Sequence, residues 1–138
     1  MLRESDRLEV EALGFTPEQA LKFSFDSSDQ RYSIIDDHGL IGMFGVGLNE
    51  DQSSVVACSV GCVWLLGSDR LKDIRFTFLR QCANWVSQLH RDYPVLWNWA
   101  DVRNELHLKW LKWLGFKIIS TDAIGVGGEE FHQFIRIK

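Results

Sequence analysis

The segment 104–116, NELHLKWLKWLGF, constrains the fold more than any other part of this sequence. Asn104 marks a helix start, and apolar side chains then recur at helical spacing on one face, namely Leu106, Trp110, Trp113 and Leu114. Gly115 suits the left-handed conformation that ends a helix, and Phe116 begins a β-rich run. The segment therefore predicts a short amphipathic helix that ends at a glycine and leads directly into a strand.

The rest of the chain alternates between helical and extended patterns. Two short helices open it, over 5–13 and after Thr16, which is an N-cap followed by Pro17. The elements expected next are a hairpin of 32–35 with 40–48, a polar turn over 49–54, a central strand over 55–66, a long helix from Ser68 or Asp69 to Leu89, a strand over 95–100, the helix after Asn104, and a hairpin of 116–120 with 130–137. This order predicts a single mixed α/β domain over 1–138, with a strand–helix–strand crossover at its centre.

Charge and tryptophan content bear on the possible partners. A net charge of −4 gives no electrostatic footprint for nucleic acid or an anionic membrane, so neither is expected as a partner. The start of the chain lacks the apolar run of a signal peptide, which favours a cytoplasmic protein. Six tryptophans are many for this length. Four of them fall in one segment and are candidate interface residues, although at least two are expected in the core: Trp97, Trp99, Trp110 and Trp113.

Two local patterns invite a ligand but are better explained by structure. Cys58 and Cys62 lack the nearby histidine pair that zinc would need, so we expect free thiols in a reducing compartment and no metal. The run Gly42–Gly47 contains Gly-x-x-Gly-x-Gly, but it lies inside a hairpin strand with no helix after it. Close packing of the strand explains these glycines.

The pattern of Asn104, a helix and then Leu114-Gly115-Phe116 resembles the last conserved element of the GNAT family, the N-acetyltransferases that use acetyl-CoA. The resemblance spans nearly the whole chain and implies a GNAT-like α/β fold, with a mixed central sheet flanked by helices. It also implies a tyrosine four residues before the glycine that protonates the CoA thiolate, and Leu111 stands there instead.

A second departure from the GNAT pattern concerns the cofactor loop. The family holds the CoA pyrophosphate with a glycine-rich loop before its long helix, whereas this junction reads LLGSDRLK over 65–72. Asp69 would place a negative charge where the pyrophosphate belongs. A helix cap is the better explanation of Ser68 and Asp69, and no cofactor is expected.

Only two residues are candidates for catalysis if the protein is an enzyme. His107 stands where the family has a small residue beside the cofactor, and Asp101 ends a strand near the substrate cleft. Each also has a structural explanation, His107 as a helix-surface residue and Asp101 as a cap. No catalytic residue is therefore assigned from the sequence.

Four segments together resemble a narrower group, the Gp13-like internal virion protein family of T7-like podophages: 63–68, 96–104, 110–116 and 130–134. The resemblance implies a non-enzymatic virion or assembly protein that contacts other phage structural proteins, such as internal, ejection, portal or tail proteins. It would be located in the virion and, during assembly, in the host cytoplasm. The alternative is a divergent acetyl-CoA-dependent N-acetyltransferase that modifies a protein and uses His107 or Asp101 for proton transfer.

Overall fold

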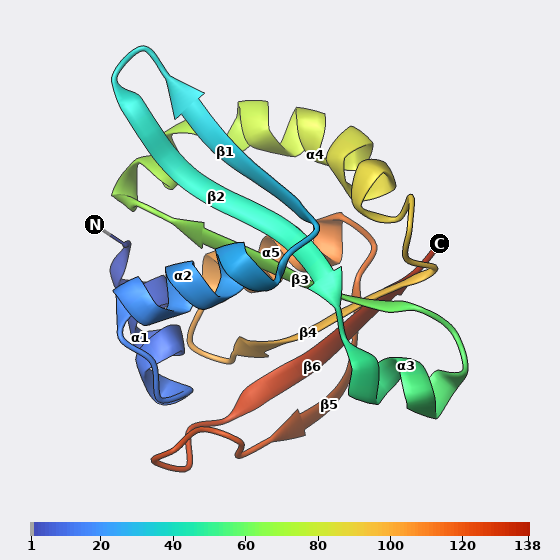
Figure 1. Ribbon diagram of the computed structural model, residues 1–138. Helices are drawn as coiled ribbons and strands as arrows, with labels where there is room; N and C mark the ends of the chain where they lie inside the picture. The colour runs from blue at the N-terminus through green and yellow to red at the C-terminus, as the bar shows by residue number, and fades with distance from the viewer. Residues whose placement is uncertain (1) are drawn as a thin grey trace.

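A single mixed sheet organises the chain in the computed structural model, which describes residues 2–138 (Figure 1). Its six strands lie in the order β1-β2-β3-β4-β6-β5. They are β1 (Gln30–Asp36), β2 (Gly39–Leu48), β3 (Val60–Gly67), β4 (Val95–Asp101), β5 (Lys117–Asp122) and β6 (Phe131–Ile137). The helices are α1 (Glu4–Ala12), α2 (Pro17–Ser27), α3 (Glu50–Val56), the 3-10 helix η1 (Asp69–Ile74), α4 (Arg75–Leu89) and α5 (Glu105–Trp113).

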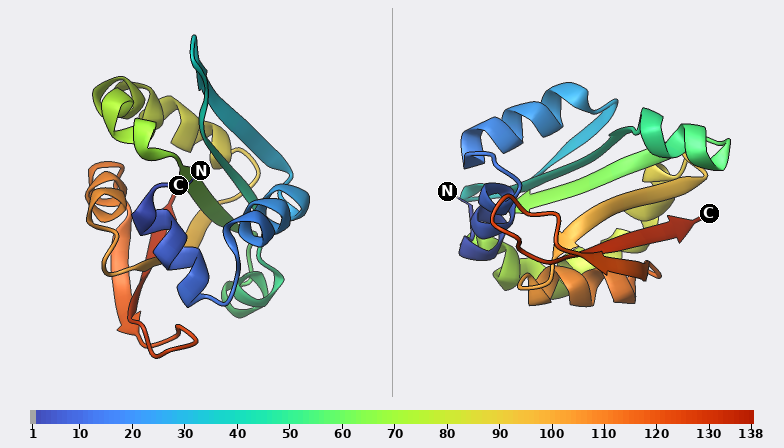
Figure 2. Two further views of the ribbon diagram at one scale, coloured as in Figure 1. Left: turned by 90° about the vertical axis from the view of Figure 1, so that its left-hand side faces the viewer. Right: turned by 90° about the horizontal axis from the view of Figure 1, so that it is seen from below.

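The helices cover the sheet unequally. In Figure 2, α2 lies over one face, and α4 and α5 lie over the other. Helix α1 lies at the end of the sheet where β3 and β4 finish, because its residues hydrogen-bond to the last residue of each strand. All neighbouring strands are antiparallel except β3 and β4, which are parallel and are connected by the α4 crossover. This is the strand–helix–strand crossover that the sequence predicts.

The largest core cluster lies between the sheet and helices α4 and α5. It is built from β-sheet residues and from the apolar faces of both helices, including Val63, Val86, Leu111, Phe116 and Phe134. Leu111 is only 7% exposed, so the apolar residue in the tyrosine position is part of this core. A smaller cluster of Val10, Ala20 and Leu66 packs α1 and α2 against the opposite face.

Most predicted elements are confirmed, including Thr16 as the N-cap of α2. Its side chain accepts from the Gln19 N–H, and the Gln19 side chain accepts from the Thr16 N–H in return. The strand glycines are confirmed as close-packing positions. A Cβ at Gly45 would collide with the carbonyl oxygen of Gln30, and one at Gly47 with that of Ser27. The Gly-x-x-Gly-x-Gly run is therefore a consequence of tight packing of β2 against its neighbours β1, β3 and α2.

The predicted turn over 49–54 is wrong. These residues begin helix α3, because the Asn49 side chain accepts a hydrogen bond from the Gln52 N–H at 2.9 Å and caps it. The helix runs through Val55, which is 79% exposed, and ends at Ala57 in the left-handed conformation. The central strand accordingly begins at Val60 rather than Val55.

The predicted long helix is also modified at its start. Ser68 does not cap it, because the Ser68 hydroxyl donates to the Ile41 carbonyl at 2.8 Å. The chain instead forms the 3-10 helix η1, and α4 begins only at Arg75, with no side-chain cap at Ile74. The interpretation of Ser68 or Asp69 as the cap of the long helix is therefore wrong.

Candidate functional site

A cleft opens in the middle of the sheet where the two parallel strands separate. β3 and β4 pair only from Val60 to Cys62 and from Val95 to Trp97, and then diverge. Asn98 spans the point of divergence, because its Nδ2 donates to the Val63 carbonyl at 2.6 Å. Beyond Asn98, the facing edges of both strands have no neighbouring strand, so their backbone groups are available to other partners.

Two cavities meet in this cleft. One, of about 320 Å³, lies on the side of α1 and α2, and the other, of about 80 Å³, lies on the side of α4 and α5. Both are lined by Val63, Trp64, Leu65, His107 and Phe134. A ligand bound in the cleft therefore reaches both sides of the sheet at these five residues.

His107 from α5 lies at the junction of the two cavities. The side chain is half-buried, and its Nδ1 atom is fully buried without a hydrogen-bond partner among residues 2–138. Burial lowers the pKa of His107 to about 4, while the charges of Asp6 and Arg3 act in opposite directions. The imidazole is therefore neutral at pH 7, with one N–H donor and one acceptor nitrogen.

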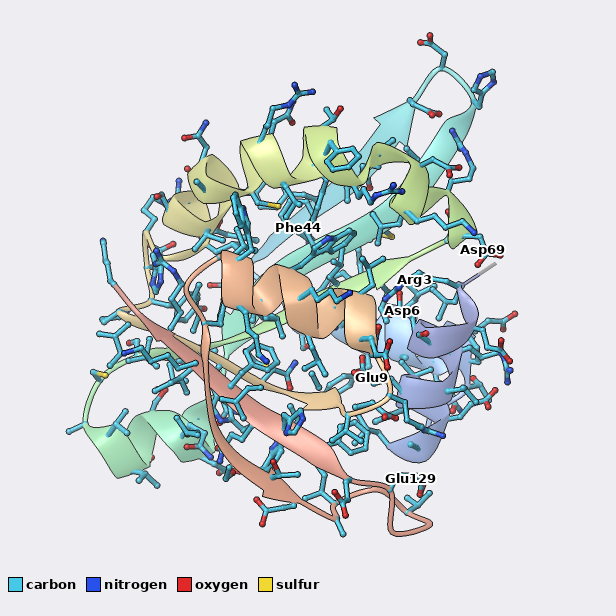
Figure 3. The ribbon with its side chains drawn as sticks, turned by 180° about the vertical axis from the view of Figure 1, so that it is seen from behind. Arg3, Asp6, Glu9, Phe44, Asp69 and Glu129 are labelled. Atoms are coloured by element: carbon cyan, nitrogen blue, oxygen red, sulfur yellow. The ribbon has the colours of Figure 1, made fainter. Side chains whose placement is uncertain are left out.

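The first turn of α1 closes the β3 end of the cleft with a buried polar network. The Arg3 guanidinium donates to the Asp6 carboxylate at 2.8 Å and to the Asn104 Oδ1 at 2.8 Å. Asp6 also accepts from the Asn104 Nδ2 at 3.0 Å and from the Gly67 N–H at 2.9 Å. Figure 3 shows Arg3, Asp6 and Glu9 on the side of α1 that faces α5. The network joins α1, the end of β3 and the start of α5.

Glu9 closes the β4 end of the same cleft and lines the larger cavity. Its carboxylate is buried and accepts one hydrogen bond, from the Asp101 N–H at 2.7 Å. Burial raises the pKa of Glu9 to about 8. The Asp101 N–H lowers it only in part, and the neighbouring carboxylates of Asp6 and Asp101 raise it further. A carboxylate with this pKa can accept and release a proton near neutral pH.

The sequence did not single out Glu9. The signal that could have found it is that Asp6 and Glu9 lie three residues apart on α1, on a face that also includes Val10. All three are buried. Two acidic residues on the buried face of a helix are unusual, because a buried charge requires a partner or a shifted pKa.

Asp101 lies beside Glu9, but its carboxylate already has a partner. Arg103 binds it through the backbone N–H at 2.9 Å and through the guanidinium at 2.6 Å. Burial alone would raise the pKa of Asp101, but these Arg103 contacts outweigh it and hold the pKa below its usual value. The interpretation of Asp101 as a helix cap is wrong, because the Arg103 N–H that it binds lies before Asn104, the N-cap residue of α5. A role for Asp101 as a base stays a prediction.

The four tryptophans predicted as interface candidates lie in different environments. Trp97 and Trp110 are 9% and 4% exposed. Trp97 donates to Gln133, and Trp110 packs against Phe78. Trp99 lines the larger cavity, and only Trp113 is largely exposed, at 72%. The expectation that at least two belong to the core is met by Trp97 and Trp110, while an interface role for any of the four stays a prediction.

The cysteines form no disulfide, and burial raises the pKa of Cys62 to about 11 and of Cys82 to about 12. Both therefore remain thiols at neutral pH. Within residues 2–138, no group of three or more histidine, cysteine or acidic side chains is placed to hold a metal ion. No helix in that same part of the chain is both long and apolar enough to span a bilayer.

Comparison with known proteins identifies the fold. No family model and no curated protein matches the sequence. Among solved structures, the chain is similar to a ribosomal-protein-alanine N-acetyltransferase from Brucella melitensis, with 13% identity and a TM-score of 0.64 over 88% of this chain and 76% of that one. A spermidine N-acetyltransferase variant from Vibrio cholerae matches with 12% identity and a TM-score of 0.60, over 87% and 72%. A GNAT-family acetyltransferase from Streptococcus pneumoniae matches with 12% identity and a TM-score of 0.59, over 89% and 77%.

The protein therefore has the GNAT fold, as the segment ending at Gly115 indicates. The same comparison corrects the functional prediction. Each of these three neighbours is an acetyltransferase, which overturns the prediction of a non-enzymatic virion protein without a cofactor. Nothing among the neighbours supports the narrower resemblance to the phage family. The partners and location implied by that resemblance are untested predictions.

Proposed function

We propose that this protein is an acetyl-CoA-dependent N-acetyltransferase whose acceptor amine binds in the cavity beside α1 and α2. The observation that carries the proposal is the cleft between β3 and β4, which has a neutral histidine at its centre and, on the acceptor side, a buried carboxylate whose one partner is the Asp101 N–H. The likeness of the fold to acetyltransferases supports the same class of reaction.

The residues of the cleft fit the reactive end of acetyl-CoA. The open edge of β3 beyond Val63 and the unpartnered His107 Nδ1 offer polar groups inside an otherwise apolar slot. Phe78 and Trp110 line its α4–α5 side. When bound, acetyl-CoA supplies the acetyl group as a thioester, whose C–S bond breaks as the new C–N bond forms.

The diphosphate end of the cofactor would meet a different surface. The Gly67 N–H, which begins the junction before α4, is bound to Asp6, and the junction lacks the glycine pattern of the family. The start of α4 is not open either, because η1 runs directly into it and the Arg75 N–H is bound to the Lys72 carbonyl. We therefore expect the reactive end of acetyl-CoA to contribute more to affinity than its phosphates.

Glu9 and His107 supply the proton chemistry. An amine reacts only as the free base, and Glu9, with its pKa of about 8, takes the proton that the acceptor ammonium loses. His107 is neutral, and its N–H donates to the sulfur as negative charge develops there. This contact fills the role that Leu111 cannot perform, because an alkyl side chain has no proton to donate.

Calorimetric titration with acetyl-CoA is the direct test. Saturable binding with a Kd below about 100 μM, equivalent to about −5.5 kcal/mol, is expected. The absence of binding at millimolar acetyl-CoA would overturn the proposal.

A second test follows thiol release with a mixture of amines. His107→Leu is expected to lower kcat by about 100-fold or more, which is the usual range for loss of proton-transfer assistance. Leu111→Tyr is expected to raise kcat, because it restores a donor in the smaller cavity. Lys109→Tyr is the matched control, since Lys109 is exposed on the same helix and should leave kcat unchanged.

A further inference from the structure

The walls of the larger cavity are mainly apolar and aromatic. They come from α1, from α2 and the turn before it, and from the diverging strands, and include Val10, Leu13, Phe15, Phe23, Trp64 and Trp99. Phe15 and Phe23 stack on each other at 5.9 Å and are 38% and 63% exposed. This pair places an aromatic surface at the side of the cavity that faces solvent.

Much of the polar capacity of the wall is already used within the chain. The Ser27 and Ser28 hydroxyls each donate to a carbonyl of α2 at 2.6 Å, and Ser28 also accepts from the Trp64 indole at 2.7 Å. Asn98 uses both ends of its amide, one for Val63 and one for the Trp99 N–H. A ligand with many hydroxyl or amino groups would lose hydrogen bonds to water without regaining them here.

Among residues 2–138, Glu9 is the only charged residue that lines this cavity. Its Oε1 atom accepts the Asp101 N–H, while its Oε2 has no hydrogen-bond partner among residues 2–138. No lysine or arginine lines the wall, so a bound anion would have no counter-charge. The cavity therefore offers one negative charge, which is enough to pair with one cation.

The volume limits the size of the ligand. The larger cavity has a volume of about 320 Å³. This lies at the lower end of the range for small-molecule pockets.

We propose that the acceptor is a small primary amine with a single positive charge and an apolar body about the size of an aromatic ring. Its ammonium pairs with Glu9, and its body lies between Trp64, Trp99 and the stacked pair of Phe15 and Phe23. This inference rests on the proposed function, because it names the substrate class of the same site. Polyamines and amino sugars fit poorly, since each carries several groups that need polar partners.

Binding measurements with three probes test this inference without acetyl-CoA. The probes are 2-phenylethylamine, 2-phenylethanol, which keeps the body without the charge, and spermidine, which keeps the charge without the ring. At pH 8.5 Glu9 is mostly ionised, and an alkylamine with a pKa near about 10 is still protonated. We expect 2-phenylethylamine to bind at least 10-fold more tightly than either other probe, as a charge-assisted hydrogen bond predicts.

A variant pair assigns the cation site. Glu9→Gln keeps an acceptor for the Asp101 N–H but removes the charge. It should weaken the binding of 2-phenylethylamine at least 10-fold while leaving the affinity for 2-phenylethanol unchanged. Glu11→Gln makes the same change at an exposed position of α1 and should leave the affinity for both probes unchanged. Equal affinity for the amine and the alcohol, or unchanged amine binding in Glu9→Gln, would overturn the inference.

Turnover separates this inference from the proposed function. If acetyl-CoA binds and spermidine is acetylated with a higher kcat/KM than 2-phenylethylamine, the proposed activity stands and the substrate class is wrong. If acetyl-CoA binds neither the wild type nor any variant, the proposed activity fails. The probe titrations alone then decide which ligands the cavity accepts.

Discussion

The first two turns of α1 place two buried carboxylates in contrasting environments. Asp6 binds Arg3, Asn104 and the Gly67 N–H, so its charge is fully paired. Glu9, one turn later, has a single N–H partner and faces a cavity. Burial alone therefore does not make a carboxylate reactive. The number of partners decides whether it fixes the structure or remains available to a substrate.

The largest effect is expected when the paired carboxylate is removed. Asp6→Ala leaves the Arg3 guanidinium, the Gly67 N–H and the Asn104 amide without their shared partner, which should lower the free energy of unfolding by about 3–5 kcal/mol. Urea denaturation followed by circular dichroism measures the change. Glu11→Ala is the control, because it removes only an exposed ion pair with Arg7 and should cost about 0–1 kcal/mol. Similar losses for the two variants would break the contrast within α1.

The second effect is the pH dependence that Glu9 imparts. The pKa of Glu9 is raised from 4.5 to about 8 in the folded state, so the folded state binds more protons than the unfolded state between these values. The contribution of Glu9 to the free energy of unfolding is fully present below pH 4.5 and is lost as pH rises through about 8. From pH 5 to pH 7, the free energy of unfolding of the wild type should fall by about 2–3 kcal/mol relative to that of Glu9→Gln.

Denaturation of both proteins at each pH measures this difference. The charged groups that face Glu9 are Arg3 and Asp6 at the start of α1 and Asp101 on β4. All three remain in the variant. A difference in unfolding free energy that does not change with pH would show that Glu9 is ionised throughout the range.

The smallest of these effects has the opposite sign and belongs to His107. Its pKa is lowered from 6.5 to about 4, so the unfolded state binds the extra proton first, and stability falls as pH drops below 6.5. From pH 7 down to pH 5, the free energy of unfolding of the wild type should fall by about 1–2 kcal/mol relative to that of His107→Leu. Asp6 and Arg3 are the charged groups that act on this ring.

The imidazole proton resonances of His107 provide an independent measurement. They should show no titration between pH 5 and pH 8. Titration of His107 near pH 6.5 would place it in water and remove the role that we propose for it.

Much of the fold could be predicted because its signals are local. Gly115 has a φ of 87°, the conformation that a glycine after a helix is expected to adopt, and Thr16 is the expected N-cap of α2. The error at α3 is local too. The Asn49 cap turns a polar segment into a helix, and the polar composition resembled that of a turn.

The site was less predictable because it depends on contacts between distant segments. The raised pKa of Glu9 comes mainly from its burial, and its one hydrogen-bond partner, the Asp101 N–H, is 92 residues away in the sequence. His107 was identified as a candidate from its position, but its neutral state follows from burial at the junction of two cavities. The absence of the family tyrosine and glycine loop favoured a protein without enzymatic activity, and the structural neighbours corrected that interpretation.

The sequence by itself determined the order of most helices and strands, because periodicity, caps and glycines act over a few residues. The resemblance to the GNAT family indicated how these elements are arranged. Only the tertiary structure decided which carboxylate is paired and which faces a cavity. It brings α1 against the separated ends of β3 and β4, where Asp6 meets three partners and Glu9 meets one. The reason is that desolvation and hydrogen bonding depend on which groups meet in space, and spacing along the chain does not specify that.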